Sequence, residues 1–404
     1  MDNETITTRC CIVGGGPAGI MLGFLLARAG IETTVVEKWP DFFRDFRGDT
    51  LHPSTLEILY ELDLLDEFLQ LPHNKTYQLS GEIGRHKVII ADFSQLKVRC
   101  PFIAFIPQWD FLSFIAKHAQ QLSTFKLLMH TEAIDLITEQ GKVAGILAKD
   151  SVKIFKIHAD LVIGADGRHS VIRAKSNLQV ESLSAPMDVL WFRLSRKTSD
   201  TQQTMGKIDL GRMIVMIERG DYWQCGYLIR KGDFDTIRNN GIAAFRQDII
   251  AVAPLLADRV QELQNWEQIK LLTVVVDHLQ KWYRPGLLCI GDAAHAMSPI
   301  GGVGINLAIQ DAVAAANILL PAFKANAMTE DVLAAVQKRR ELPTKLIQRG
   351  QVFLQNRIIA RVLGNATHPK LPLLIQLLQW FPYLRRLPAY IVGVGVRPEH
   401  IKKM

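Results

Sequence analysis

The sequence predicts an α/β fold: a domain built on a parallel sheet, interrupted by a domain with a mainly antiparallel β-sheet, and followed by a helical C-terminal region. Three observations lead to this prediction. A strand, a glycine-rich turn, a helix and a second strand follow one another over residues 8–36. Short β-rich runs separated by turns fill residues 187–230. A buried strand at residues 287–290 then leads through a glycine-rich loop into helical periodicity.

The elements between these landmarks can be placed in order. Residues 54–71 predict one helix, in which Ser54 and Glu57 have the spacing of a capping box. Residues 108–121 predict another helix, and residues 131–148 a strand, a turn and a strand. We expect the first domain to comprise residues 1–75, 108–182 and 281–325, the antiparallel sheet domain residues 76–107 and 183–280, and the helical region residues 326–404.

The composition is that of a globular protein. The chain has 404 residues, of which 48% are hydrophobic and 22% are charged, which excludes disordered and collagen-like chains. Its five cysteines include no CxxC pair, and its first ten residues do not have the pattern of a signal peptide. We therefore expect reduced thiols, no metal site and a cytoplasmic protein.

The positive charge is concentrated in the C-terminal region. The formal net charge is +7, yet residues 331–404 alone carry +10, so we expect no nucleic-acid partner. Residues 371–396 are apolar but interrupted by Arg385, Arg386 and three prolines, whereas a membrane span needs about 18 or more unbroken apolar residues. Two interpretations stay open: a packed helix that buries its leucines, which we favour, and a basic apolar patch for peripheral contact with a membrane.

The turn GGGPAG, residues 14–19, has the spacing of a dinucleotide-binding loop between a strand and a helix. Gly14 permits the tight turn, Gly16 lets a pyrophosphate approach the backbone, and Gly19 lets the helix lie close to the sheet. Glu37, at the end of the second strand, is placed to accept hydrogen bonds from a ribose diol. The pattern predicts a dinucleotide whose adenosine half has no 2′-phosphate.

Two later stretches complete a set of three motifs: GADGRHSVIR at residues 164–173 and GDAAHAMSPIGGVGINLAIQDA at residues 291–312. Together with GGGPAG, in this order and spacing, they resemble the fingerprints of the class A flavoprotein monooxygenases, the p-hydroxybenzoate hydroxylase-like family. The resemblance covers about the first 320 residues. It implies a Rossmann-like FAD-binding domain interrupted by a substrate domain, with FAD as the cofactor and NAD(P)H as the co-substrate.

The resemblance also implies which residues contact FAD. Beside the glycines of the first motif and Glu37, they are Pro17, Ala18, Arg47, Gln108, Asp166, Asp292, Pro299, Gly302, Gly304, Ile305 and Asn306. Asp292 matches an aspartate that binds a ribityl hydroxyl, and the backbone at residues 304–306 matches a helix start that faces the pyrimidine end of the flavin. For Asp166 a purely structural role in the turn is an alternative. No side chain is assigned as a general acid or base, His169 and His295 included.

The substrate is expected to lie against the sheet between the second and third motifs. If residues 212–218 and 222–229 are regular strands, alternation and a rough alignment place Met216 and Gln224 on the face toward the flavin. Pro299 matches a proline near both flavin and substrate. The arginine that binds the carboxylate in p-hydroxybenzoate hydroxylase has no counterpart here, so we expect an apolar or aromatic small molecule rather than a small aromatic acid.

The resemblance implies a monooxygenase that uses NAD(P)H and O2 to hydroxylate or epoxidise its substrate through a C4a-hydroperoxyflavin. No second dinucleotide loop opens a helix in the sequence, so NAD(P)H is not expected to have a Rossmann domain of its own. Two alternatives stay open: a flavin-dependent dehydrogenase or reductase of the same fold that acts on a quinone or prenyl-type substrate, and a flavin-binding partner protein without turnover.

Overall fold

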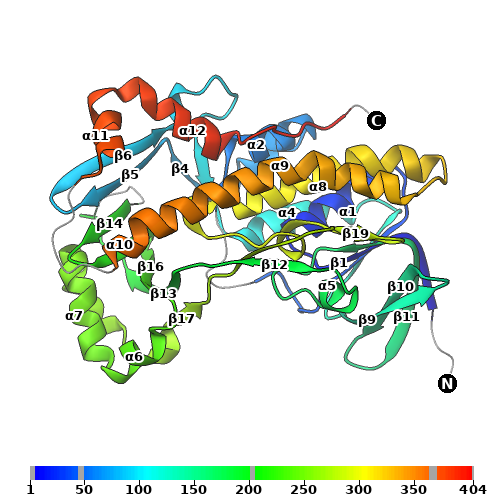
Figure 1. Cartoon of the computed structure of the whole chain (residues 1–404), viewed down its shortest axis with the longest axis horizontal. Helices are drawn as coiled ribbons and strands as arrows, with labels where there is room; N and C mark the ends of the chain where they lie inside the picture. Colours follow the sequence, from blue (N-terminus) through cyan, green and yellow to red (C-terminus); the bar gives the residue numbers. More distant parts are fainter. Residues whose placement is uncertain (1–4, 44–49, 201–204, 364–370, 403–404) are drawn as a thin grey trace.

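The computed structural model describes residues 5–43, 50–200, 205–363 and 371–402, and it shows two main sheets surrounded by helices (Figure 1). The first sheet has eight strands. In spatial order they are β19 (Tyr283–Arg284), β20 (Leu287–Cys289), β11 (Ile154–Gly164), β1 (Thr5–Val13), β2 (Thr33–Val36) and β8 (Phe125–Leu128), with β10 (Lys142–Lys149) and β9 (Glu132–Glu139) continuing from β11. The strands from β20 to β8 run parallel, so their carboxyl ends meet at one edge of the sheet.

Both faces of the first sheet are covered, which is why β2 is buried at every position. Helices α1 (Pro17–Arg28), α4 (Gln108–Ala119) and α8 (Gly304–Lys324) share one apolar core with the sheet. Helix α5 (Val171–Lys175) and the β9–β10 pair cover the other face. The stretch Ile300–Lys324 is long and apolar enough to cross a membrane, but most of it is buried inside the protein, as in the core helix of a globular fold.

The second sheet has seven strands and is antiparallel except between β14 and β5. In spatial order its strands are β17 (Lys270–Leu272), β13 (Met187–Ser195), β16 (Tyr222–Arg230), β15 (Arg212–Glu218), β14 (Met205–Asp209), β5 (Gln78–Ile83) and β6 (His86–Asp92). Helix α7 (Ile242–Val252), which follows α6 (Phe234–Asn239), packs its apolar side on one face of this sheet. Two small sheets consist of β3 (Thr50–Leu51), β7 (Ile103–Phe105) and β4 (Asn74–Thr76), and of β12 (Val180–Leu183) and β18 (Val276–Leu279).

The predicted fold class is confirmed, while the boundaries between its domains stay a prediction. One predicted helix is wrong. Residues 54–71 form two helices, α2 (Pro53–Glu61) and α3 (Leu65–Phe68), instead of one. The helical conformation is interrupted at Asp63, whose φ of 62° is left-handed. The expected capping box is also wrong: His52 occupies the N-cap position of α2, and no side chain caps that helix.

The C-terminal region is helical, and its longest helix crosses the molecule from the first sheet to the second (Figure 1). Its elements are α9 (Glu330–Leu354), a π-helical turn (Gln355–Ile359), α10 (Ala360–Val362), α11 (Leu373–Trp380), a 3-10 turn (Pro382–Arg385) and α12 (Arg386–Gly393). Helix α11 buries Ile375 and Leu378 against the β5–β6 hairpin, whereas Leu373 and Leu374 are exposed. The expectation that this segment buries its leucines is therefore wrong for one face of α11.

A glutamine holds α11 on strand β6, which is the edge strand of the second sheet. The side-chain oxygen of Gln379 accepts a hydrogen bond from the main-chain N–H of Ile89 (3.1 Å). Its side-chain nitrogen donates to the main-chain oxygen of Ile89 (3.0 Å). These two bonds place α11 directly over the edge of the sheet.

Candidate functional site

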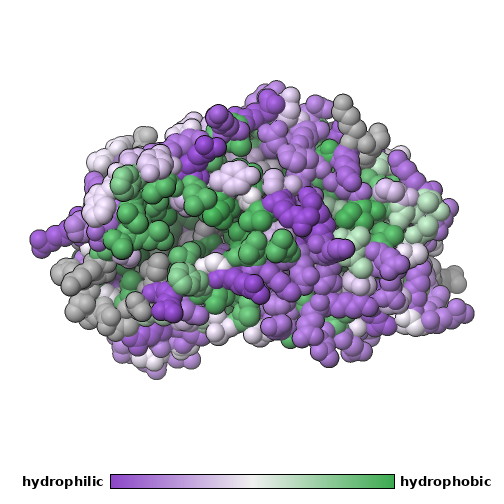
Figure 2. Space-filling view, turned by 45° about the horizontal axis from the view of Figure 1, so that its top comes forward, coloured by the Kyte–Doolittle hydropathy of each residue, from purple (hydrophilic) through white to green (hydrophobic). Residues whose placement is uncertain are grey.

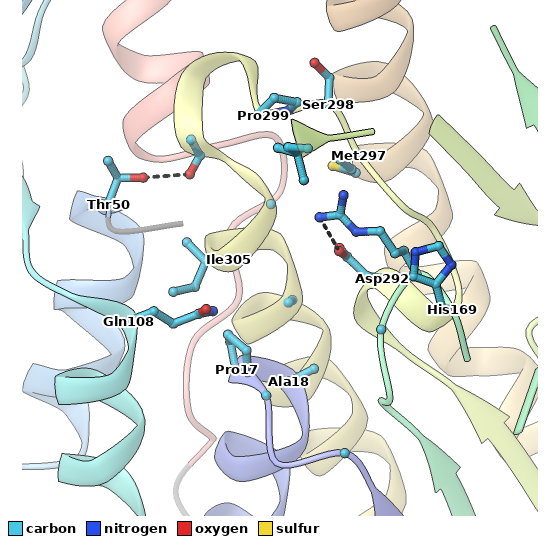
Figure 3. A pocket seen from close by; sticks show the side chains of 18 of the residues that line it. Pro17, Ala18, Thr50, Gln108, His169, Asp292, Met297, Ser298, Pro299 and Ile305 are labelled. Atoms are coloured by element: carbon cyan, nitrogen blue, oxygen red, sulfur yellow. Dashed lines mark hydrogen bonds and ion pairs between the residues drawn. The ribbon is translucent and has the colours of Figure 1, made fainter. Parts of the chain in front are cut away.

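A cavity of about 970 Å³ lies between the two sheets. It is lined by the carboxyl ends of β1, β2 and β11, by the first turns of α1, α4 and α8, and by strands β13, β15 and β16. In Figure 3, Pro17 of α1, Gln108 of α4 and Ile305 of α8 come together around one space. Small-molecule sites usually have volumes of roughly 300–1,000 Å³, so this cavity suits a large ligand.

Three glycines shape the end of the cavity next to α1. Gly14 has a φ of 104°, and a Cβ there would lie 2.4 Å from the main-chain oxygen of Ala165. A Cβ on Gly19 would lie 1.9 Å from the oxygen of Gly14, whereas a Cβ on Gly16 would meet nothing within 4 Å. Helix α1 begins at Pro17, with neither a side-chain cap nor an acidic residue in its first turn. The tight positions bring the helix onto the sheet, and its positive end faces open space, as an anion site requires.

Glu37 follows β2 and lines the cavity beside this loop. Its Oε2 accepts a hydrogen bond from the N–H of Gly15 (2.8 Å), and its Oε1 accepts one from the N–H of Trp39 (3.2 Å). The two bonds hold the carboxylate at the end of the strand, where the dinucleotide-binding motif predicts a ribose.

Asp166 and Asp292 both line the cavity but have different surroundings. The Asp166 carboxylate accepts hydrogen bonds from Oγ of Ser170 (2.5 Å) and from the N–H of Val171 (2.7 Å), at the start of α5. Burial raises the pKa of Asp166. The Asp292 carboxylate lies 3.9 Å from the Arg168 guanidinium and is partly exposed (Figure 3). The contacts of Asp166 are therefore those expected of a residue that stabilises the turn before α5. Asp292, in contrast, presents its carboxylate to the cavity.

The loop before α8 forms the opposite end of the cavity. Gly302 has a φ of 61°, and a Cβ on it would collide with Oγ1 of Thr50, which donates a hydrogen bond to the oxygen of Gly302 (2.9 Å). Asn306 is buried; it donates to the main-chain oxygen of Thr50 (2.9 Å) and accepts from the N–H of His52 (2.8 Å). The first turn of α8 has no side-chain cap and no acidic residue. A second positive helix end therefore faces the cavity.

Two buried glutamines on α9 hold the same loop from behind. Gln348 and Gln351 lie three residues apart, on one side of the helix, and each donates to two main-chain oxygens. Those that bind Gln351 belong to Ser298 (3.0 Å) and Ile300 (2.9 Å), on either side of Pro299. Neither glutamine is predicted from the sequence. Their spacing on a helix is the signal that could have drawn attention to them.

The wall that the second sheet gives to the cavity is apolar. Its described residues on β13, β15 and β16 are Met187, Val189, Trp191, Met213, Val215, Ile217, Gln224, Gly226 and Leu228. No arginine is among the lining residues that the structure describes on this sheet, and Lys270 at β17 is the charged one. The wall therefore suits an uncharged surface rather than a carboxylate.

The predicted face of Met216 is wrong. Met216 pairs with Cys225, and both are buried in the core that the sheet shares with α7. Gln224 pairs with Ile217, and both line the cavity. Because side chains alternate along a strand, a shift of one residue between paired strands exchanges the two faces. Oε1 of Gln224 accepts a hydrogen bond from Nε of Arg219 (3.2 Å), which orients its amide group.

The other predicted residues are distributed as follows. Those that line the cavity are Gly14, Gly16, Pro17, Ala18, Gln108, Pro299, Gly302, Gly304 and Ile305. Gly19 and Asn306 lie behind this surface, where they pack the loops at its two ends. Arg47 is outside the described residues.

A buried charged cluster lies beneath the Asp292 loop. Oδ2 of Asp311 accepts from the N–H of Gly291 (3.1 Å) and contacts Nε2 of His295 (2.5 Å), while Oδ1 accepts from Nε of Arg340 (2.9 Å). Arg340 also donates to Glu399 (3.2 Å). Burial opposes the ionisation of Asp311, but the neighbouring His295 and Arg340 lower its pKa. His295 therefore contacts a structural carboxylate rather than the cavity.

These features fit FAD. The open position at Gly16 and the uncapped start of α1 suit a pyrophosphate, Glu37 and Asp292 suit sugar and ribityl hydroxyls, and the start of α8 suits an electron-rich ring edge. Among the described residues, no group of three or more His, Cys, Asp and Glu side chains could hold a metal ion.

The chain is similar to known proteins in sequence and in fold. The family described as FAD binding domain matches residues 7–350. The chain is 30% identical to the 6-methylpretetramide 4-monooxygenase of Streptomyces rimosus, over 95% of this chain and 90% of that enzyme.

Two solved structures have a similar fold. The OxyS anhydrotetracycline hydroxylase from Streptomyces rimosus has a TM-score of 0.77 at 21% identity, over 98% of this chain and 78% of that one. PqsL, a probable FAD-dependent monooxygenase from Pseudomonas aeruginosa, has a TM-score of 0.75 at 20% identity, over 89% of this chain and 98% of that one. At these identities the likeness concerns the fold alone.

Proposed function

The chain belongs to the class A FAD-dependent monooxygenases, and we propose that it uses NAD(P)H and O2 to oxygenate a large, apolar, multi-ring aromatic substrate. The proposed class of substrate rests on one observation. A single cavity joins the two positive helix ends of α1 and α8 to an apolar sheet wall whose described residues include no arginine.

We propose that FAD lies along this cavity, held by the sequence-predicted residues that line it. The first turn of α1 and Gly16 would hold the pyrophosphate, Glu37 the ribose, and Asp292 the ribityl chain. FAD, when bound, supplies the activation of O2. Asp166 supports this arrangement by accepting hydrogen bonds from Ser170 and Val171 at the start of α5, which fixes the loop that carries Arg168.

The chain's own residues would stabilise charge, orient the substrate and exclude water. The N–H groups at the start of α8 favour negative charge at the adjoining end of the cavity. Gln351 fixes the loop that carries Pro299. The apolar wall removes water from the substrate, which protects reactive species from side reactions.

Gln224 is the polar group of this wall on β16. Because its side-chain oxygen accepts from Arg219, its NH2 group is the donor offered to a substrate oxygen. A multi-ring phenol or quinone-like molecule presents such an oxygen on an otherwise apolar plane. Support also comes from the relative that is 30% identical in sequence, which is named for its substrate 6-methylpretetramide.

The proposal is tested with purified full-length protein. We expect acid-released flavin to be FAD, and NAD(P)H consumption to rise when multi-ring phenols are added. In the presence of ¹⁸O-labelled O2, one labelled atom should enter the product. A dehydrogenase or reductase would oxidise or reduce the substrate without incorporating the label, and that outcome would refute the monooxygenase reaction.

We also propose a cytoplasmic location and domain boundaries as the sequence predicts them. The location is supported by the five cysteines, which are all buried and unpaired. Reduced, buried thiols are typical of proteins from reducing compartments.

A further inference from the structure

Large apolar side chains are exposed on one part of the surface more than elsewhere. We call the exposed residues of α11, α12 and the turn between them the tail patch. They are Leu373, Leu374, Trp380, Phe381, Tyr383, Leu387, Tyr390 and Ile391, with exposed fractions between 41% and 68%. Figure 2 shows hydrophobic side chains gathered over this region of the molecule. Contiguous apolar surface of this kind marks an interaction site.

The exposure follows from the way the tail packs. Ile375 and Leu378 of α11 are buried against the β5–β6 hairpin, and Ala389 of α12 is buried next to β7 and Phe93. Each helix therefore already uses one face to contact the protein. The leucines and aromatic rings of the tail patch lie on what remains of the surface of the two helices, and the fold has bound this segment without covering them.

The charged residues of the C-terminal stretch that carries the tail patch have one sign. Between Leu342 and Pro398 the sequence contains eight Lys and Arg residues and no Asp or Glu. Arg386 is exposed within the tail patch, and Arg85 and Lys87 are exposed at the adjoining tip of the β5–β6 hairpin. The acidic side chains of that hairpin are already satisfied: Glu82 is paired with Lys207 (2.9 Å), and Asp92 is buried and accepts hydrogen bonds from Gln78, Ser94 and Gln95.

We propose that the tail patch docks the enzyme on the surface of an anionic lipid membrane. Tryptophan and tyrosine concentrate at the membrane–water interface, apolar side chains enter the acyl boundary, and basic residues are attracted to anionic headgroups. A second copy of the chain would bring the same positive charges to the same place, so self-association through this patch is opposed by repulsion. A surface that complements the tail patch must therefore carry negative charge on the outside and be apolar underneath. An anionic lipid bilayer has both properties.

The test uses the FAD-loaded full-length enzyme and flotation with vesicles. We expect binding to phosphatidylcholine vesicles that contain a minor fraction of phosphatidylglycerol, and little binding to phosphatidylcholine alone. Binding should fall strongly at about 1 M salt, where the Debye length is about 3 Å. The double variant Leu374→Ser/Trp380→Ser should bind about tenfold more weakly, and Arg386→Gln should reduce binding to the anionic vesicles.

A matched control removes exposed apolar residues from another surface. Val152 and Ile154 are 87% and 52% exposed near β11, and Val152→Ser/Ile154→Ser should bind vesicles as the parent enzyme does. Retained FAD and an unchanged melting temperature show that each variant is folded. Absence of binding to anionic vesicles, or equal binding by the tail-patch variant, overturns the proposal. So does a dimer in solution that the tail-patch variant abolishes, because the patch would then be a subunit interface.

Discussion

Nε2 of Gln351 lies 3.0 Å from the main-chain oxygen of Ser298, and this hydrogen bond joins helix α9 to the loop that shapes the centre of the cavity. The same nitrogen donates to Ile300 (2.9 Å). The loop position of Pro299 therefore depends on a helix that begins far away on the first sheet (Figure 1).

Gln351→Leu should impair oxygen transfer more than cofactor binding. It removes the donor from one buried and one partly buried carbonyl oxygen, at a cost of about 1–3 kcal/mol each, which the loop relieves by moving. We expect FAD to be retained, while the yield of oxygenated product per NAD(P)H falls and the yield of hydrogen peroxide rises. Gln376→Leu, on α11, removes a similar bond to Leu371 and should leave this yield unchanged. Equal yields for the Gln351 variant and the parent enzyme would refute the positioning role.

Asp292→Ala should weaken FAD binding. Removing the carboxylate leaves a ribityl hydroxyl without its acceptor in a largely closed site, a loss of about 1–3 kcal/mol. This corresponds to about tenfold or more in the dissociation constant, measured by titrating apoprotein with FAD and following flavin fluorescence. Asp135→Ala removes an exposed carboxylate that pairs with Lys175 and serves as the control. An unchanged dissociation constant in the Asp292 variant would contradict the assignment.

Gln224→Leu and Met216→Leu form a matched pair on opposite faces of the second sheet. The Gln224 variant removes the polar group of the cavity wall, so KM for a phenolic substrate should rise by about tenfold, which corresponds to about 1.4 kcal/mol and is within the usual contribution of one hydrogen bond. The Met216 variant replaces one apolar side chain in the core with another, which usually costs less than about 1.5 kcal/mol of stability. Its KM should not change. If KM instead rose for the Met216 variant and stayed unchanged for the Gln224 variant, Met216 would face the cavity, as the sequence predicts.

Stability should decrease in mild acid because of His52. Burial lowers the pKa of this histidine from 6.5 to about 4, although its ring also bonds to the oxygen of Val392. Between these two pH values the unfolded chain binds the extra proton, so the free energy of unfolding decreases as pH falls from about 6.5 to about 4. The full contribution is about 3 kcal/mol.

His52→Asn keeps a side-chain donor and removes the titrating group. Urea unfolding at a series of pH values should therefore show a shallower loss of stability for this variant between pH of about 6.5 and about 4. If the two pH profiles run parallel, the acid sensitivity has another origin.

The neighbouring arginines 339 and 340 should differ widely in their contribution to stability. Arg340 is buried between Asp311 and Glu399, while Arg339 binds Glu399 from a partly exposed position. Arg340→Met leaves a buried carboxylate without its guanidinium partner and should cost about 3–5 kcal/mol. Arg339→Met should cost about 0–1 kcal/mol. Thermal unfolding of the two variants makes the comparison, and similar melting temperatures would show that the buried cluster is not a stabilising one.

The sequence predicts the parts of this protein that depend on local geometry. Gly14, Gly16 and Gly19 have fixed spacing because a strand, a turn and a helix must meet there, and each glycine has a distinct steric reason in the structure. The same applies to Gly302 and to the helix that follows it. Such positions are recognisable without knowledge of distant contacts.

Contacts between distant segments are harder to predict. Gln351 meets Ser298 across 53 residues of sequence, and no local pattern indicates which carbonyl oxygens a helical glutamine will bind. The prediction for Met216 is wrong for another reason. The face of a strand depends on its pairing with the neighbouring strand, and a one-residue error, invisible in an apolar run, exchanges the cavity for the core.

The contact between Gln379 and Ile89 has a consequence for the behaviour of the protein at high concentration. An edge strand with free N–H and C=O groups invites pairing with an edge strand from another molecule, the first step of β-aggregation. Gln379 gives Ile89 both hydrogen bonds that a residue of an antiparallel neighbour would supply. A single side chain thus takes the place of a further strand at Ile89, and with α11 packed beside it, a strand from a second molecule cannot pair with β6 at this residue.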